Sequence, residues 1–227
     1  MMSNAVFKNL LEVESEPVRW LWEGRIPSGK VTLLQGEPGI GKTMLALELA
    51  ARVSRGASMP PTKGHEIDPG NVVVFTGDDG LADTIRPRLE AAGADLSRIW
   101  AVDREIDKDD LAQLHPALII LDPIAAYICM SCERDPIQVM RNLGRLARET
   151  GAAVLAVLSS DEKDHVLRPE FYSTPRSILS LTAVGHGGRR LAITKSNLRN
   201  IPDVHPMVYY LNNEGGVVRI VNWSDGR

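Results

Sequence analysis

The sequence predicts an α/β fold in which helices flank a mostly parallel central sheet and a β-rich portion follows at the C-terminal end. Two observations lead to this fold class. Continuous apolar runs, typical of strands buried on both faces, alternate with helical patterns along residues 31–160. Beyond residue 160 the alternation gives way to short β-runs and turns. The 227 residues suit a single domain and are enough to bury a substantial core.

The charge balance argues against a protein whose whole surface attracts polyanions. The chain has 26 basic and 29 acidic residues and a net charge of −3, so any contact with nucleic acid must be local. Its start, MMSNAVFKNLLEVESEP, lacks the basic-then-apolar pattern of a signal peptide. Asp122 and Pro123 interrupt the most apolar run, Ala117–Met130. We therefore expect a cytoplasmic protein that does not bind a membrane.

A glycine-rich turn connects the first apolar β-run, Val31–Leu34, to an apolar helical run, Met44–Val53. The turn reads GEPGIGKT and fits the P-loop pattern GxxxxGK[ST] at every position. In such a loop the glycines let successive N–H groups and the start of the following helix face a phosphate chain. The lysine reaches the β- and γ-phosphates, and the threonine hydroxyl binds Mg²⁺. The alternative is a glycine turn that only joins a strand to a helix.

Because strand, loop and helix follow one another in the required order, the pattern predicts ATP and Mg²⁺ as cofactors. The residues expected to contact the nucleotide are Gly36, Glu37, Pro38, Gly39, Ile40, Gly41, Lys42 and Thr43. Upstream of the loop, Trp20 and Trp22 are candidates for stacking on the adenine base.

Acidic residues follow two of the predicted strands. Asn71–Gly77 is a continuous β-branched run that ends at Asp78 and Asp79, and Ala117–Leu121 delivers Asp122 at its carboxyl end. Open α/β sheets bind their ligands at this edge. An aspartate at the position of Asp122, the Walker B position, normally holds Mg²⁺ through a water molecule, together with the P-loop hydroxyl.

The remaining elements follow from helical periodicity, β-branched runs and turn residues. Helices are predicted at Leu81–Ala92 and Pro136–Thr150. On the second helix Arg141, Arg145 and Arg148 share one side, which we interpret as a solvated face. Further strands, of which the last two form a hairpin, are predicted at Ile99–Val102, Ala152–Leu158, Ser177–Leu181, Arg190–Thr194, Met207–Leu211 and Val217–Val221.

These elements divide the single predicted domain into three parts. Residues 1–30 are expected to be a leading segment, of which Val18–Lys30 packs on the sheet edge, and residues 31–160 to be the P-loop core. Residues 161–227 form a loop and the β-rich C-terminal part. We find no internal repeat in this organisation.

Cys129 and Cys132 are the only cysteines, and their C-x-x-C spacing admits a redox pair or half of a zinc site. A zinc site needs two further ligands at matching spacing, whereas the five histidines are scattered singly along the sequence. We therefore interpret both cysteines as ordinary loop residues.

The arrangement resembles the RecA-like P-loop ATPases, and within them the RepA-type AAA family of hexameric replicative helicases. KaiC-like and DnaB-like proteins are more distantly similar. The resemblance covers nearly the whole chain, through the segments WLWEGRIPSGKVTLLQGEPGIGKT, TGDDGLADTIRPRLEAAGAD, ALIILDP, TPRSILSL and KSNLRN. It implies a RecA-like fold and a homo-oligomer that forms a hexameric ring.

Residue by residue, the resemblance implies that Lys42 and Thr43 are the phosphate and magnesium residues and that Asp122 is the Walker B carboxylate. Arg176 aligns with the arginine finger of the family, which reaches the γ-phosphate held by the neighbouring subunit. Such an arginine stabilises the charge that develops on the transferring phosphoryl group. The alternative for this residue is a surface or salt-bridged arginine. Secondary candidates for contacts across the same interface are Lys195 and Arg199.

Two departures from the family pattern predict slow hydrolysis. Family members end the second strand with a glutamate that orients the attacking water, whereas this chain has Asp78, followed by Asp79. Aspartate is one methylene shorter, and a displacement of about 1 Å at a reacting centre costs roughly a hundredfold in rate. The family also carries a histidine after the fourth strand, where this chain has Ser159 and then an acidic stretch with Lys163. We expect Asp78 to act as the base, with Asp79 as the alternative.

The leading hypothesis is therefore a Mg²⁺-dependent ATPase that forms a ring and acts on single-stranded DNA, as a helicase or translocase in replication or recombination. The DNA part of this hypothesis rests on the resemblance. The alternative is an ATP-dependent assembly or regulatory protein with weak or no hydrolysis, which works with a separate protein partner. A small-molecule kinase is less well supported, because the stretch Ser159–Thr174 has one arginine where such kinases carry an arginine-rich lid.

Overall fold

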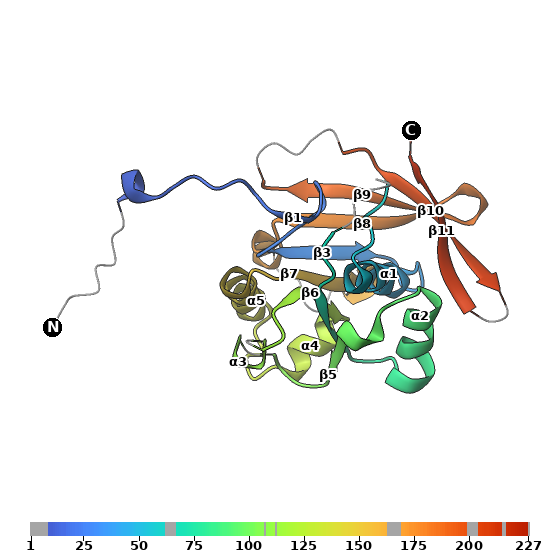
Figure 1. The fold of residues 1–227 in the computed structure, drawn as a ribbon, viewed down its shortest axis with the longest axis horizontal. Coiled ribbons are helices and arrows are strands. Elements are labelled where there is room, and N and C mark those ends of the chain that lie inside the picture. The colour runs from blue at the N-terminus through green and yellow to red at the C-terminus, as the bar shows by residue number, and fades with distance from the viewer. Residues whose placement is uncertain are drawn as a thin grey trace.

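The computed structural model describes residues 9–61, 67–106, 108–111, 113–162, 169–198, 204–214 and 217–226. Within these residues nine strands form one central sheet, in the order β11-β10-β9-β8-β3-β7-β6-β4-β5 (Figure 1). The strands are β3 (Val31–Gly36), β4 (Asn71–Thr76), β5 (Ile99–Val102), β6 (Pro116–Asp122), β7 (Ala153–Ser159), β8 (Ser177–Val184), β9 (Gly188–Ser196), β10 (Met207–Glu214) and β11 (Val217–Asp225). This sheet confirms the predicted fold class.

The pairing of the strands changes from parallel to antiparallel at β8. From β5 to β8 every strand is parallel to its neighbours. Beyond β8, strands β9, β10 and β11 each run antiparallel to the strand before them. The β-rich C-terminal residues therefore extend the same sheet that carries the P-loop, and β10 and β11 form the predicted hairpin.

Both faces of the sheet are buried, which explains the unbroken apolar runs of its central strands. Leu34 and Val74 pack in the core on one face with helices α1 (Lys42–Arg55) and α2 (Arg86–Ala91). Leu33 and Val73 pack on the other face, which is covered by α3 (Lys108–Leu111), α4 (Ile124–Met130) and α5 (Pro136–Thr150). Successive residues of a strand alternate between the two cores because strand side chains have a period of two.

Helix α5 has the bounds that the sequence predicts, because its caps are local. The side chain of Asp135 accepts a hydrogen bond from the N–H of Ile137 at 3.2 Å, and Pro136 occupies the first turn. At the other end Gly151 adopts φ +76°, the left-handed conformation that ends many helices. The apolar stripe of the helix, Val139, Met140, Leu143, Leu146 and Ala147, is buried.

Two predicted elements differ from the structure. The helix predicted at Leu81–Ala92 begins with a π-helical turn, Leu81–Ile85, and only Arg86–Ala91 is α-helical. The apolar run Ala117–Met130 divides at Pro123, so that β6 is followed by the short helix α4, which the sequence analysis did not predict. Cys129 therefore lies in a helix rather than in a loop, and Cys132 follows that helix; both cysteines are exposed and free.

The leading segment reaches the sheet through a small hairpin of β1 (Trp20–Trp22) and β2 (Ile26–Pro27). Trp22 is 2% exposed, and its ring meets that of Trp223 edge to face with centroids 6.0 Å apart. Its indole N–H donates to the carbonyl of Pro60 at 2.6 Å. Before this hairpin the chain runs away from the body of the molecule (Figure 1). Among the described residues, none of the helices has the length and apolar character needed to cross a membrane.

Candidate functional site

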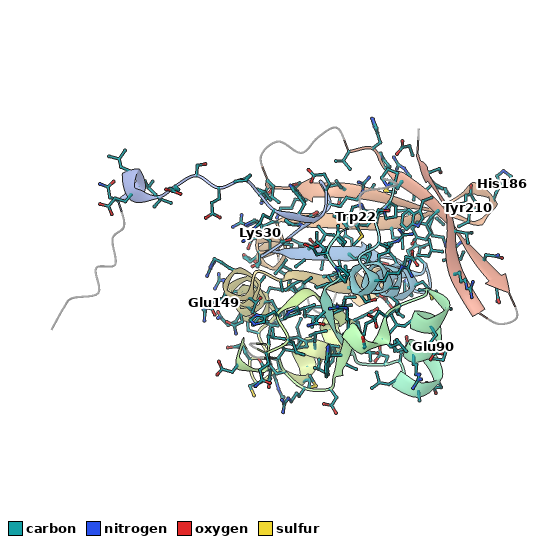
Figure 2. All side chains as sticks on the ribbon, in the orientation of Figure 1. Trp22, Lys30, Glu90, Glu149, His186 and Tyr210 are labelled. Carbon is teal, nitrogen blue, oxygen red and sulfur yellow. The ribbon has the colours of Figure 1, made fainter. Side chains whose placement is uncertain are left out.

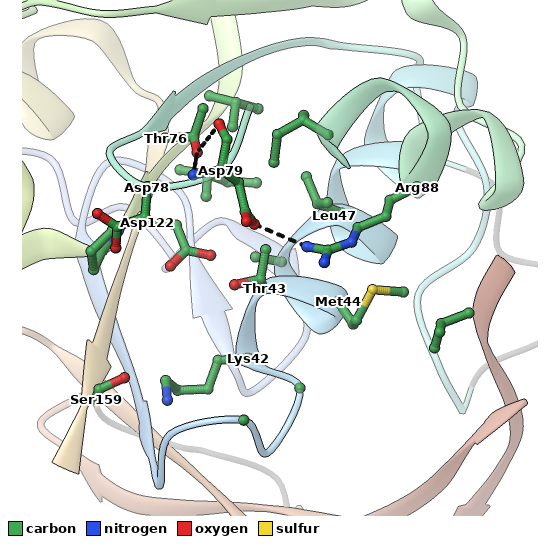
Figure 3. A pocket seen from close by; sticks show the side chains of 18 of the residues that line it. Lys42, Thr43, Met44, Leu47, Thr76, Asp78, Asp79, Arg88, Asp122 and Ser159 are labelled. Atoms are coloured by element: carbon green, nitrogen blue, oxygen red, sulfur yellow. Dashed lines mark hydrogen bonds and ion pairs between the residues drawn. The ribbon is translucent and has the colours of Figure 1, made fainter. Parts of the chain in front are cut away.

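A cavity of about 450 Å³ lies at the carboxyl ends of the parallel strands. The loop between β3 and α1, the residues after β4, the end of β6 and the end of β7 all contribute to its wall (Figure 3). It therefore brings together most of the side chains that the sequence analysis selected. Those that line it are Gly39, Gly41, Lys42, Thr43, Asp78, Asp79, Asp122 and Ser159.

The P-loop has the backbone shape that phosphate binding requires. A Cβ on Gly36 would lie 2.6 Å from the carbonyl oxygen of Leu181 on β8, so only glycine fits where the loop leaves the sheet. Gly41 adopts φ +102°, a conformation that costs little only in glycine. The Lys42 ammonium donates to the carbonyls of Gly36 and Glu37 at 3.0 and 2.9 Å. Its charge is thus held over the loop, where a phosphate chain would bind.

Asp122 is the carboxylate most affected by its surroundings. Burial raises its pKa to about 6, although the hydrogen bond with the Thr43 side chain and the charge of Lys42 act in the opposite direction. Its buried Oδ2 has no hydrogen-bond partner among the described residues. A buried carboxylate with an unsatisfied oxygen next to a hydroxyl offers the oxygen ligands that Mg²⁺ prefers. The residues present therefore fit a magnesium ion.

Two consecutive aspartates after β4 have different environments. The Asp79 carboxylate accepts a hydrogen bond from Arg88 of α2 at 2.9 Å, and the backbone of Asp79 is bonded to the Thr76 hydroxyl (Figure 3). Asp78 is exposed and forms no ion pair with any residue in the described part of the chain. Both aspartates line the cavity, and Asp78 is the one that is not held in an ion pair among the described residues.

The sequence analysis missed part of this wall. Arg88 lines the cavity from α2, and Leu211 and Val218 line it from the β10–β11 hairpin. The hairpin residues lie far along the chain, and no pattern near the P-loop indicates them. Neither Trp20 nor Trp22 lines the cavity, and Trp22 is part of the core, which contradicts a role in stacking on the base.

Arg176 does not belong to this cavity. Its backbone N–H donates to the carbonyl of Val31 at 2.9 Å, at the amino end of β3, whereas the P-loop follows the carboxyl end of that strand. The length of β3 separates the two points by about 17 Å at 3.3 Å per residue. Lys195 lies close to Arg176, and its ammonium donates to the carbonyls of Tyr172 and Pro175. The other two basic candidates, Lys163 and Arg199, lie outside the described residues.

A family model described as an AAA domain matches residues 2–160, which include the P-loop and the end of β6. The chain belongs to this AAA domain family. Its match and the fold together confirm a RecA-like P-loop ATPase, as the sequence analysis expected at that level. The match does not extend to a particular branch of the family.

Individual proteins give the same assignment. The DNA repair protein RadA of Brucella abortus is 24% identical over 221 residues, which cover 89% of this chain and 43% of RadA. RadA of Mycobacterium tuberculosis is 26% identical over 161 residues, or 71% of this chain and 32% of RadA. The chain thus spans less than half the length of these curated relatives. The structure of a KaiC-like protein from Pyrococcus horikoshii matches with a TM-score of 0.62 at 17% sequence identity. The match covers 91% of this chain and 100% of the KaiC-like chain.

Proposed function

We propose that this AAA domain protein binds ATP with Mg²⁺ in the cavity at the P-loop and hydrolyses it to ADP and phosphate. The observation that supports this most directly is the position of Asp122. Its unsatisfied carboxylate oxygen lies beside Thr43, where the family pattern places the magnesium ligands. Lys42, held over the loop, is positioned to balance the charge of the β- and γ-phosphates.

Each side chain has a defined part in the reaction that we propose. The loop N–H groups and Lys42 orient the phosphate chain, and Thr43 and Asp122 hold the magnesium ion. When bound, Mg²⁺ would neutralise part of the negative charge of the phosphate chain. Asp78 orients a water molecule and accepts its proton as the water oxygen bonds to the γ-phosphorus and the bond to the β-phosphate oxygen breaks. ADP leaves with the electron pair of that bond.

We further propose that the active form is a homo-oligomer, in the family manner a hexameric ring. Arg176 is exposed and lies at the opposite end of β3 from its own P-loop. It can therefore serve as an arginine finger only at the site of a neighbouring copy. The similar RadA proteins are described as DNA repair proteins. We propose that the partner of the ring is single-stranded DNA. The ring would act on it as a helicase or translocase in replication or recombination.

A specific observation favours a second function, an assembly or regulatory protein that binds ATP, hydrolyses it slowly and works with another protein. The residue expected to orient the water is an aspartate, and Ser159 takes the place of a histidine at the end of β7. Both changes weaken the contacts that accelerate hydrolysis in the family pattern. The residues for binding ATP and Mg²⁺, in the P-loop and at Asp122, are all present.

The experiment that separates these functions is steady-state phosphate release from ATP and Mg²⁺, with and without single-stranded DNA. Lys42→Ala tests the site, and Lys108→Ala on α3 is a matched loss of a lysine elsewhere. DNA-stimulated release that disappears only in Lys42→Ala supports the motor. ATP binding without release above Lys42→Ala supports the regulator. Equal phosphate release by the wild type, Lys42→Ala and Lys108→Ala contradicts both functions, because the activity would not come from this cavity.

A further inference from the structure

A second cavity, of about 360 Å³, lies at the other end of the sheet and is strongly basic. It forms where β3 and β8 begin, between these strands and helix α5. Figure 2 shows Lys30 and Glu149 at this end of the molecule, away from His186. We call it the arginine pocket; the residues that define it are Lys30, Arg141, Arg145, Arg148 and Arg176.

The shape of the arginine pocket is fixed by packed elements. Arg141, Arg145 and Arg148 follow one another at steps of four and three residues, so they share one face of α5 over about 10 Å of helix. The facing wall includes Ser173 and Thr174. Ser173 ends the short helical segment Pro169–Ser173, in which Phe171 is fully buried. A Cβ on Gly144 would lie 3.2 Å from the Thr174 side chain, so helix and segment are in close contact.

The charges of the arginine pocket are not balanced within the described residues. None of its five basic side chains makes an ion pair there, whereas Arg52, Arg86, Arg88, Arg98 and Arg104 each pair with a carboxylate. The nearest acidic residue on the helix, Glu149, is one turn beyond Arg145 but forms no ion pair with it. Lys195 is a further basic group near Arg176, and burial, together with the charge of Arg176, lowers the pKa of its ammonium. Crowded like charges repel one another, and a bound anion would remove that cost.

The chemistry of the lining identifies the class of anion. Guanidinium groups bind phosphate oxygens in pairs, in a geometry that a single ammonium cannot match. The cavity is compact, and none of its lining residues is aromatic, whereas sites for single-stranded nucleic acid usually stack bases on aromatic rings. We propose that the arginine pocket is a second phosphate site, which binds the phosphoryl groups of a compact di- or triphosphate.

Two sources could supply such phosphates. One is a free oligophosphate or nucleotide in solution. The other is ATP in the P-loop of a second copy, in which case Arg141, Arg145 and Arg148 would hold the phosphates that Arg176 approaches. This second source rests on the proposed function, because it requires that copies assemble with one P-loop facing the arginine pocket of the next.

The phosphate site is tested by calorimetric titration of the 227-residue chain with inorganic tripolyphosphate. The first variant carries Lys42→Ala, which weakens anion binding at the P-loop. The second variant carries Arg145→Ala and Arg148→Ala in addition. We expect the loss of both arginines to weaken binding at least about tenfold, because each charge-assisted contact contributes on that order. The control is Lys42→Ala with Arg134→Ala, an exposed arginine outside the pocket. Equal affinity in all three proteins, or no binding, would overturn the proposal.

The source is identified by mixing two defective proteins. Lys42→Ala retains the arginine pocket, and Arg145→Ala/Arg148→Ala retains the P-loop, so only a mixed assembly can join an intact P-loop to an intact pocket. Phosphate release above the sum of the two proteins supports ATP of a second copy. With a wild-type protein that releases phosphate, the lack of such a gain together with tripolyphosphate binding supports a free anion. The titration needs no hydrolysis, so it remains decisive even if the wild-type protein proves inactive and the proposed function fails.

Discussion

The backbone N–H of Arg176 is hydrogen-bonded to the carbonyl of Val31 at 2.9 Å, which places this arginine where β3 begins. The P-loop begins where the same strand ends, at Gly36. One copy of the protein therefore has its nucleotide cavity and its candidate finger at opposite ends of the sheet. Any contact between the two kinds of residue requires a second copy.

Replacing Arg176 with alanine should leave the affinity for ATP nearly unchanged and lower turnover by about 10³-fold or more, the effect of arginine fingers in related reactions. The physical reason is that Arg176 does not line the cavity of its own copy. Phosphate release and the dissociation constant of a fluorescent ATP analogue measure the two quantities. Arg134→Ala is the matched control, and a loss of ATP affinity in a dilute, monomeric sample of Arg176→Ala would contradict the assignment.

Asp78→Ala and Asp79→Ala should have different effects. Loss of a general base typically lowers the rate by about 10²- to 10⁴-fold, and we expect this result for Asp78→Ala with ATP affinity retained. Asp79 is paired with Arg88 at 2.9 Å, so its replacement should mainly release that arginine and change turnover much less. Single-turnover hydrolysis of ATP compares the two variants. A larger loss in Asp79→Ala would transfer the role of base to that residue.

Asp122 should make the stability of the metal-free protein depend on pH. Burial raises its pKa to about 6 from 3.8, so the folded state holds a proton that the unfolded state releases. The stabilisation is complete below pH 3.8 and is lost as the pH rises to about 6. At pH 8 the free energy of unfolding is therefore lower by about 3 kcal/mol, because a shift of one pKa unit corresponds to about 1.36 kcal/mol.

Asp122→Asn removes this titration and should stabilise the protein at pH 8 in EDTA by up to about 3 kcal/mol. The advantage should shrink as the pH falls towards 4, because the wild-type carboxyl becomes protonated. Urea unfolding at several pH values measures the difference. An advantage that is the same at every pH would show that Asp122 is not the titrating group.

Gly36→Ala should destabilise the fold even without nucleotide. Its Cβ would lie 2.6 Å from the Leu181 carbonyl oxygen, a backbone atom that cannot move aside cheaply. Overpacking of this kind costs about 1–3 kcal/mol. The control is Gly185→Ala, whose Cβ would meet no atom within 4 Å. Equal unfolding midpoints in urea for the two variants would contradict the close contact of β3 with β8.

Features that depend on neighbouring residues could be predicted from the sequence. The bounds of α5 follow from Asp135, Pro136 and Gly151, all of which act within one turn of the helix ends. The strands β4, β6 and β7 are visible as apolar runs, although the structure extends or trims them by a residue or two. The P-loop is recognisable because its chemistry requires a fixed spacing.

Features that depend on strand order could not be predicted in this way. No local pattern indicates that β8 lies beside β3, and this placement alone separates Arg176 from the P-loop of its own copy. The helix α4 has only seven residues, too few to show a period after the strand β6. The three arginines of α5 are interpreted as a solvated face from the sequence, and the pocket arises because the start of β3 and Ser173 and Thr174 lie next to that face.

The strand β8 has a consequence for how a ring would behave. At Leu181 it touches the first glycine of the P-loop, and just before Ser177 the chain carries Arg176, the residue that we propose as the finger for another copy. A strand buried in a sheet is stiff along its length, so a shift at one end is transmitted to the other. The copies in such a ring would then not hydrolyse ATP independently. One inactive copy should lower the rate of ATP hydrolysis by its neighbours. In mixtures of active and inactive chains, total activity would then fall faster than the fraction of active chains.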